Sequence, residues 1–148
     1  MHITVCDADT LPGGEAAASP PSQTLTIDVP ASEWLTANGR YHWADKARRA
    51  RVLRRRGRLL ARAAGLRPSP TGRVQVTAHV HTRTRGRMDP ANASPTTKAL
   101  IDGALVDGRV VPDDDHAHLT GPDHRRGDTR PDLAPGWHAI TLTITTIQ

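Results

Sequence analysis

Three segments with alternating apolar and polar residues constrain the fold of this chain most strongly. They lie at positions 24–29, 73–81 and 139–147, and the last reads Ala-Ile-Thr-Leu-Thr-Ile-Thr-Thr-Ile. A period of two residues is typical of strands that bury one face. Each segment therefore predicts a strand, and a shorter strand is expected near Leu119, followed by a polar insertion that extends to Pro135.

Two helices are expected between these strands. Residues 44–64 repeat apolar residues at helical spacing, with Gly65 as the expected cap and Pro68 as a stop. Ser94 is the expected N-cap of a second helix that stops near Gly108. The order predicts an α+β domain, with a small mixed or antiparallel sheet and helices packed on one face. We expect one domain over residues 24–148, after a flexible leader over residues 1–23 that is rich in Pro, Gly, Ala and Ser.

Basic residues are concentrated in the first half of the chain. The formal net charge is +5, and residues 40–62 hold ten of the 20 basic residues but a single acid, Asp45. Such a helix can be an ordinary solvated surface, but arginines with few acids nearby repel one another unless a polyanion is present. We expect the phosphate backbone of DNA as the partner. The expected contacts on this helix are Arg48, Arg51, Arg55 and Arg58.

Aromatic residues gather between the first strand and this helix. Trp34 and the run Tyr41-His42-Trp43 lie there. Their rings can cover one end of the core or stack on bases, and core cover is the expected role.

Acids and one lysine follow the basic half. Asp89 comes just after the strand at 73–81, Lys98 lies near the start of the second helix, and Asp113, Asp114 and Asp115 form a run after that helix. Carboxylates from separate loops suit Mg²⁺, and a lysine beside them can contact a phosphate. Taken alone, Asp89 is better explained as a helix or turn cap, and three adjacent acids are usually a solvated turn. The combination predicts a metal site that holds a phosphate.

A family resemblance rests on the same stretch. Asp89, Asn92, Lys98, Asp102 and Gly108, followed by an Asp-Asp pair in Asp113-Asp114-Asp115, resemble the core motif of the RusA-type Holliday-junction resolvases. Ala91 stands where that family usually has a second aspartate, and the stretch from Asn92 to Lys98 is three residues longer than the family spacing.

The resemblance implies cleavage of branched DNA by a homodimer that depends on Mg²⁺, or alternatively Mn²⁺. It implies catalytic roles for Asp89, Lys98 and Asp114, and metal ligation by Asp89, Asp113, Asp114 and Asp115. Arg85, Arg87 and Asn92 are then expected to contact the DNA. Because of Ala91, a catalytically reduced nucleic-acid-binding protein of the same fold is the alternative. An RNA- or protein-binding accessory factor is a third hypothesis.

Other features set the expected compartment. Cys6 is the only cysteine, which excludes an internal disulfide framework and a cysteine-based zinc cluster. His116 and His118 can chelate a transition metal or can simply be exposed. No apolar run approaches the length of a membrane span, and the first ten residues lack the pattern of a signal peptide. We expect a soluble, cytoplasmic protein with no membrane partner.

Overall fold

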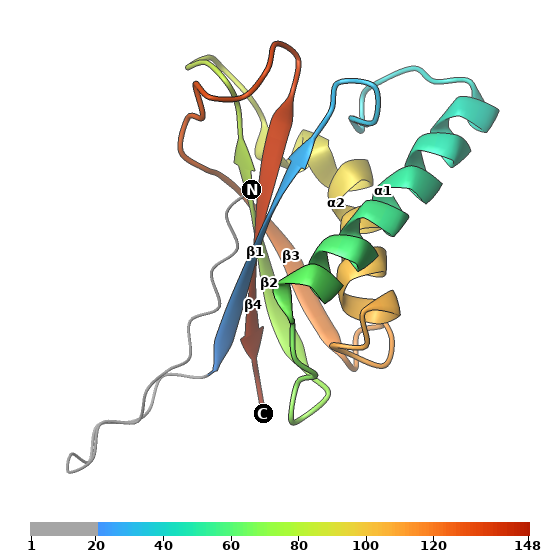
Figure 1. The fold of residues 1–148 in the computed structure, drawn as a ribbon, viewed down its shortest axis with the longest axis vertical. Helices are drawn as coiled ribbons and strands as arrows, with labels where there is room; N and C mark the ends of the chain where they lie inside the picture. The colour runs from blue at the N-terminus through green and yellow to red at the C-terminus, as the bar shows by residue number, and fades with distance from the viewer. Residues whose placement is uncertain (1–20) are drawn as a thin grey trace.

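A four-stranded mixed sheet carries the fold, with two helices packed against it (Figure 1). The structure is a computed structural model that describes residues 21–148. The strands follow the order β1-β4-β2-β3, in which β2 and β3 run parallel and the other neighbours antiparallel. The strands are β1 (Ser22–Val29), β2 (Val74–His81), β3 (Leu119–Arg126) and β4 (His138–Thr146). The predicted α+β class is confirmed.

Both helices lie on the same face of the sheet (Figure 1). The long helix α1 (Trp43–Ala64) ends at Gly65, whose left-handed backbone, with φ at 68°, confirms the expected cap. The helix α2 (Ser94–Ile101) continues directly into a π-helical turn, η2 (Asp102–Asp107), and a 3-10 turn, η1 (Pro90–Ala93), precedes it. Among residues 21–148, none of the helices has the length and apolar character needed to cross a membrane.

Three boundaries differ from the sequence expectation. The first strand begins at Ser22, so the expected leader overlaps it by two residues. Pro21 precedes the strand, and residues 1–20 lie outside the described part of the chain. Ser94 is the first residue of α2 and not its N-cap, because the chain enters that helix straight from η1. The strand near Leu119 extends to Arg126, through half of the segment expected to be a polar insertion. It pairs with β2 alone and exposes most side chains, so its sequence does not alternate.

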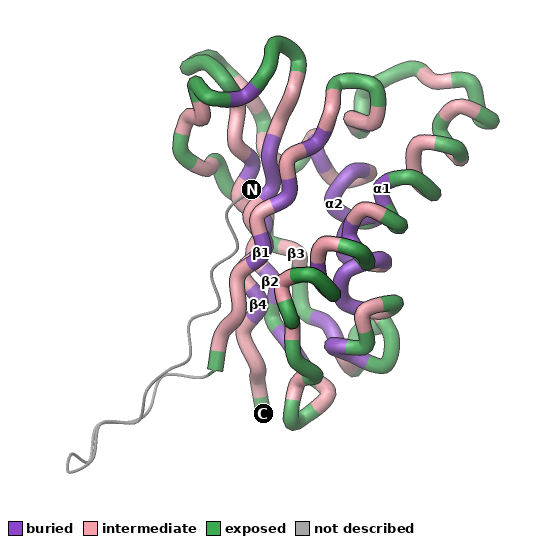
Figure 2. The backbone as a smooth tube through the Cα atoms, viewed as in Figure 1, coloured by how far each residue is buried: buried purple, intermediate pink, exposed green. Residues whose placement is uncertain are grey.

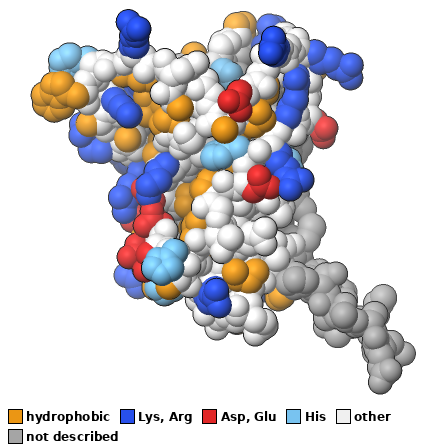
Figure 3. Space-filling model, turned by 180° about the vertical axis from the view of Figure 1, so that it is seen from behind, with side chains coloured by type: hydrophobic (Ala, Val, Ile, Leu, Met, Phe, Trp, Pro, Cys, Tyr) orange, Lys and Arg blue, Asp and Glu red, His pale blue; other side chains and the backbone are white. Residues whose placement is uncertain are grey.

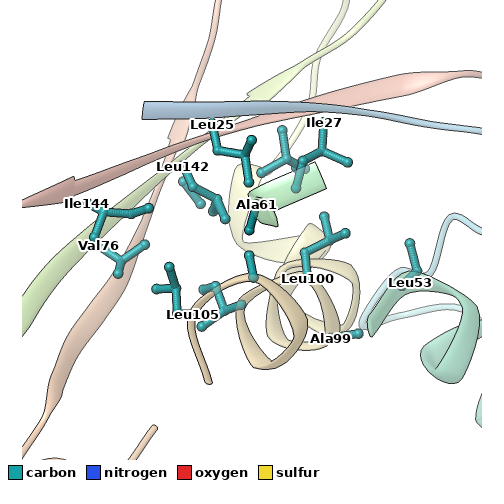
Figure 4. Packing of buried hydrophobic residues seen from close by; sticks show 14 of the residues in the cluster. Leu25, Ile27, Leu53, Ala61, Val76, Ala99, Leu100, Leu105, Leu142 and Ile144 are labelled. Atoms are coloured by element: carbon teal, nitrogen blue, oxygen red, sulfur yellow. The ribbon is translucent and has the colours of Figure 1, made fainter. Parts of the chain in front are cut away.

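The core lies between the sheet and the two helices. Leu25, Leu142 and Ile144 point from the sheet toward Leu100 and Leu105 of the helical layer (Figure 4), and all five are at most 2% exposed. In Figure 2 the buried positions lie where the sheet and the helices face each other. Burial of this apolar surface is the main stabilisation of a domain of this size.

Two glycines let α1 approach α2 and η2 closely. A Cβ atom at Gly57 would lie 2.5 Å from the carbonyl oxygen of Leu100. One at Gly103 would overlap the carbonyl oxygen of Arg54 and lie 2.7 Å from its carbonyl carbon. The backbones of the two helical segments are therefore in contact here, which fixes η2 against the middle of α1.

Candidate functional site

Lys98, Asp102 and Asp114 form an ion-pair cluster at the surface. Lys98 and Asp102 lie one helical turn apart, and the Lys98 ammonium is 3.1 Å from Asp102 Oδ1. The loop before β3 brings in Asp114, whose carboxylate accepts a second hydrogen bond from Lys98. Of the predicted catalytic residues, the structure thus joins Lys98 and Asp114, and it adds Asp102.

The two carboxylates of this cluster differ in electrostatics. Burial is the main cause of a raised pKa at Asp102, opposed by the Lys98 ammonium. The hydrogen bond from Lys98 lowers the pKa of Asp114, and the same bond raises the pKa of Lys98. One ammonium is shared by two carboxylates, so the cluster carries one net negative charge when all three groups are ionised.

The other predicted acids have different partners. Asp89 Oδ1 accepts a hydrogen bond from the backbone N–H of Ala91 at 3.1 Å and caps η1. Asp115 contacts the His118 ring at 2.6 Å, and Asp113 accepts the backbone N–H of Asp114 at 2.8 Å. Asp89, Asp113 and Asp115 therefore do not contact the Lys98 ammonium. Within residues 21–148, no group of three or more His, Cys, Asp or Glu side chains is arranged to hold a metal ion.

The donor set of the cluster nevertheless suits Mg²⁺. This ion binds through one or two carboxylates, keeps several waters and takes further oxygens from a substrate phosphate. Asp102 and Asp114 offer two neighbouring carboxylates, and both are partly accessible. Zinc would require a tetrahedral set of nitrogen, sulfur or carboxylate ligands that this cluster does not supply.

A groove of about 810 Å³ opens beside the cluster, between α1, α2 and β3. Lys98, Asp102 and Asp114 line it, together with His124 from β3. From α1 it is lined by Lys46, Arg51 and Arg54.

Sequence reasoning placed Asp102 in the family motif but gave it no catalytic or metal-binding role, and it did not assign Arg54 or His124 to the site. The spacing of Asp102, four residues after Lys98, was the available signal for an ion pair on one helix face. His124 gave no such signal, because its segment was expected to be irregular.

The arginines of α1 fall into two sets. Four have acidic partners: Arg48 and Arg49 bind Asp45, Arg54 binds Asp107, and Arg56 binds Glu33. Asp45 was the one acid expected nearby, so the pairs that the sequence did not predict are those of Arg54 and Arg56, whose acids come from other elements. We call the other four the arginine stripe; all are exposed, form no salt bridge within residues 21–148, and follow one another at helical spacing as Arg51, Arg55, Arg58 and Arg62. Arg58 is close enough to Asp107 to help lower the pKa of that carboxyl.

Figure 3 shows the molecule from behind. Lys and Arg side chains gather along the left edge of this view, the side on which α1 lies, with Asp and Glu side chains and hydrophobic surface beside them. Of the four α1 arginines predicted to bind DNA, Arg51, Arg55 and Arg58 lie in the arginine stripe, and Arg48 binds Asp45.

The remaining predicted DNA contacts lie apart from α1. Arg85 and Arg87 are exposed in the loop after β2. Asn92 instead holds the loop between β1 and α1, because its Oδ1 accepts a hydrogen bond from the backbone N–H of Asn38 at 3.1 Å. This hydrogen bond gives Asn92 a structural role in positioning the entry to α1.

Core cover, the expected role of the aromatic rings, holds for Trp34 and not for Trp43. Trp34 stacks on His138 with ring centroids 4.0 Å apart and packs against the core. Trp43 is 77% exposed at the start of α1.

No protein-family model matches the chain, and no curated protein matches it significantly. The function proposed for the chain therefore depends on the chemistry of its own residues.

The Arg54–Asp107 pair makes the stability of the folded protein depend on pH. Two hydrogen bonds of 2.7 and 2.8 Å from Arg54 lower the pKa of Asp107 below its ordinary 3.8. The folded state therefore binds this proton more weakly than the unfolded state, so the stabilisation is complete above that ordinary value and is lost as pH falls through the lowered pKa. We expect Asp107→Asn to lower the melting temperature at neutral pH and to flatten its decline on acidification from about pH 6 to about pH 2. Thermal melts followed by circular dichroism measure both effects.

Asp123→Asn is the matched control, since its pair with Arg125 is exposed and lies within one strand. It should leave the melting curve unchanged at every pH. Parallel acid curves for wild type and Asp107→Asn would contradict the role of this pair.

Proposed function

We propose that the chain is a magnesium-dependent endonuclease of the RusA type, acting on branched DNA as a homodimer in the cytoplasm. The observation that carries the proposal is the cluster of Lys98, Asp102 and Asp114 in a groove whose edge meets the arginine stripe. A nuclease needs hard oxygen ligands, a cation near the scissile phosphate and a basic surface for the rest of the backbone. The groove and the stripe supply all three kinds of group.

Each group has a distinct role in this proposal. Asp102 and Asp114 would hold Mg²⁺, which when bound supplies an acidified water and offsets charge on the phosphate. Lys98 would place its ammonium against a non-bridging phosphate oxygen, exchanging part of its contact with the two carboxylates for the substrate. The arginine stripe would hold the adjoining backbone and fix its direction along α1.

The catalytically reduced DNA-binding protein is the second candidate. It is favoured by the position of Asp89, which caps η1 and does not contact the Lys98 cluster. In that case the arginine stripe would bind branched DNA, and the cluster would only stabilise the loop before β3.

Nicking of a synthetic four-way junction separates the two candidates. We expect wild type to nick the junction in the presence of Mg²⁺, and Asp114→Asn to bind it equally well but to nick it at least about 100-fold more slowly, since a metal ligand is lost. Asp115→Asn is the matched control, because Asp115 pairs with His118 outside the cluster. It should nick like wild type. Tight binding by wild type without any nicking would favour the second candidate.

The arginine stripe makes a separate prediction. Arg55 has no acidic partner in the described part of the chain, whereas Arg56 donates two hydrogen bonds of 2.7 Å to Glu33. We expect Arg55→Ala to reduce the slope of log affinity against log salt by about 0.9 without changing the melting temperature. Fluorescence anisotropy with a labelled junction at several salt concentrations measures the slope.

Arg56→Ala is the control for this experiment. It leaves Glu33 with 13% exposure and no partner, so it should lower the free energy of unfolding by about 2 kcal/mol and leave the salt slope unchanged. The same slope in wild type and Arg55→Ala would contradict a phosphate contact at Arg55.

A further inference from the structure

The groove beside the cluster contains a histidine with a fixed tautomer. Thr97 is fully buried, and its hydroxyl donates to the backbone carbonyl of Ser94 at 3.1 Å. The same oxygen lies 2.8 Å from His124 Nε2, and with its own proton directed at the Ser94 carbonyl it accepts a hydrogen bond from the Nε2-protonated tautomer of the ring. Burial lowers the pKa of His124, against the opposing carboxylates of Asp123 and Asp89, and favours the neutral ring. His124 Nδ1 is then a proton acceptor with no partner among residues 21–148.

The walls of the groove that His124 lines are mostly apolar. Leu35, Ala50, Ala99, Ile101, Leu119 and Pro122 line the groove with it. The volume of about 810 Å³ is of the size that holds small organic ligands. A flat, mostly apolar ring with one N–H donor fits these walls and the Nδ1 acceptor.

The charges that line the groove favour a ligand that carries an anionic group beside its ring. Lys46, Arg51, Arg54 and Lys98 face two acids, Asp102 and Asp114, so the lining has a net charge of +2. Lys46 and Arg51 have no acidic partner in the described residues. Cations at the edge and an apolar interior complement a nucleotide, with its phosphates outside and its base inside.

We propose that this groove binds one unpaired nucleotide of the DNA, with its base against the apolar wall and an N–H of the base donating to His124 Nδ1. The inference builds on the proposed function, because it takes DNA as the ligand. It deepens that function by naming an unpaired nucleotide, such as one at a branch point, as the feature of the substrate that the groove reads. A base inside a duplex has its N–H groups paired and its faces stacked, and cannot occupy the groove.

The test compares duplexes that differ only in one bulged position. The probes are a duplex with a single bulged thymidine, the same duplex with a bulged abasic site, and the fully paired duplex, all without magnesium. The backbone charge at the bulge is the same in the first two probes, so the arginine stripe treats them alike. We expect the bulged thymidine to bind about tenfold more tightly than the abasic bulge, from one base contact and one hydrogen bond. A bulged N3-methylthymidine, which lacks the N–H donor, should lose most of that preference.

Two variants and one control test whether the base binds in the groove. His124→Leu removes the acceptor, and Ala50→Leu fills the groove from α1, so both should bind the two bulged duplexes equally. His79→Leu, on β2, changes a histidine outside the groove and should keep the tenfold preference. Melting curves confirm that each variant is folded.

Equal binding of the two bulged duplexes by wild type would overturn the inference, as would an unchanged preference in both groove variants. This binding experiment contains no magnesium and does not measure nicking. A wild type that prefers the bulged base but never nicks a junction with magnesium would refute the proposed nuclease and leave the base site standing. A wild type that nicks the junction but shows no preference for the bulged base would refute the base site and leave the proposed nuclease standing.

Discussion

Gly103→Ala is expected to lower the free energy of unfolding by about 3 kcal/mol, the largest stability effect of any single methyl group in the helical layer. The added Cβ would overlap the carbonyl oxygen of Arg54 and approach its carbonyl carbon to 2.7 Å. Both atoms belong to the backbone of α1, so neither can rotate away. Relief requires α1 and η2 to separate, which opens the core around Leu100 and Leu105. Urea unfolding followed by circular dichroism measures the loss.

Gly86→Ala is the matched control, because a Cβ at Gly86 meets nothing within 4 Å. It should change the free energy of unfolding by less than about 0.5 kcal/mol. Similar effects of the two substitutions would mean that α1 and η2 are not in backbone contact at Gly103.

Lys98→Ala is expected to slow junction nicking by about 100-fold or more while changing junction affinity only slightly. The ammonium is the cation that offsets the charges of Asp102 and Asp114 and that can meet the phosphate in the same groove. Its loss leaves two adjacent carboxylates facing an anionic substrate. Single-turnover nicking at saturating protein separates this effect from a change in binding.

Lys46→Ala is the control for Lys98, since Lys46 lines the groove but does not contact the two carboxylates. It should weaken binding modestly and leave the single-turnover rate unchanged. Equal nicking rates for Lys98→Ala and wild type would show that the lysine serves only the local fold.

The fold could be predicted where burial leaves a pattern in the sequence. The strands β1, β2 and β4 bury one side chain in two, so their alternation is visible. The strand β3 could not be delimited in this way, because it lies at the edge of the sheet and most of its side chains are exposed. His124, which lies on β3, was missed for the same reason.

The candidate site could be predicted only in part. Lys98 and Asp114 were expected to lie near each other, and the ion pair between them confirms it. Asp89 was expected in the same cluster, but its carboxylate caps η1, an equally common role for an aspartate before a proline. Spacing along a sequence does not decide between these roles, because both place an acid just before a turn.

The partners of the α1 arginines could also be predicted only in part from the sequence. Counting acids between Arg40 and Arg62 gave Asp45 as the single local partner, yet Glu33 and Asp107 reach Arg56 and Arg54 from other elements. Long-range pairs of this kind cannot be read from local composition. The stripe that remains without salt bridges in the described chain is therefore a more specific prediction of a phosphate contact than the whole helix was.

We propose that the groove cleaves branched DNA with the help of magnesium. A magnesium titration tests this directly, with wild-type protein acting on a labelled four-way junction and on a linear duplex of the same sequence. We expect nicks near the branch point of the junction, none without magnesium, and little or no nicking of the linear duplex. Equal nicking of the two DNAs, or tight junction binding with no nicking at any magnesium concentration, would contradict it.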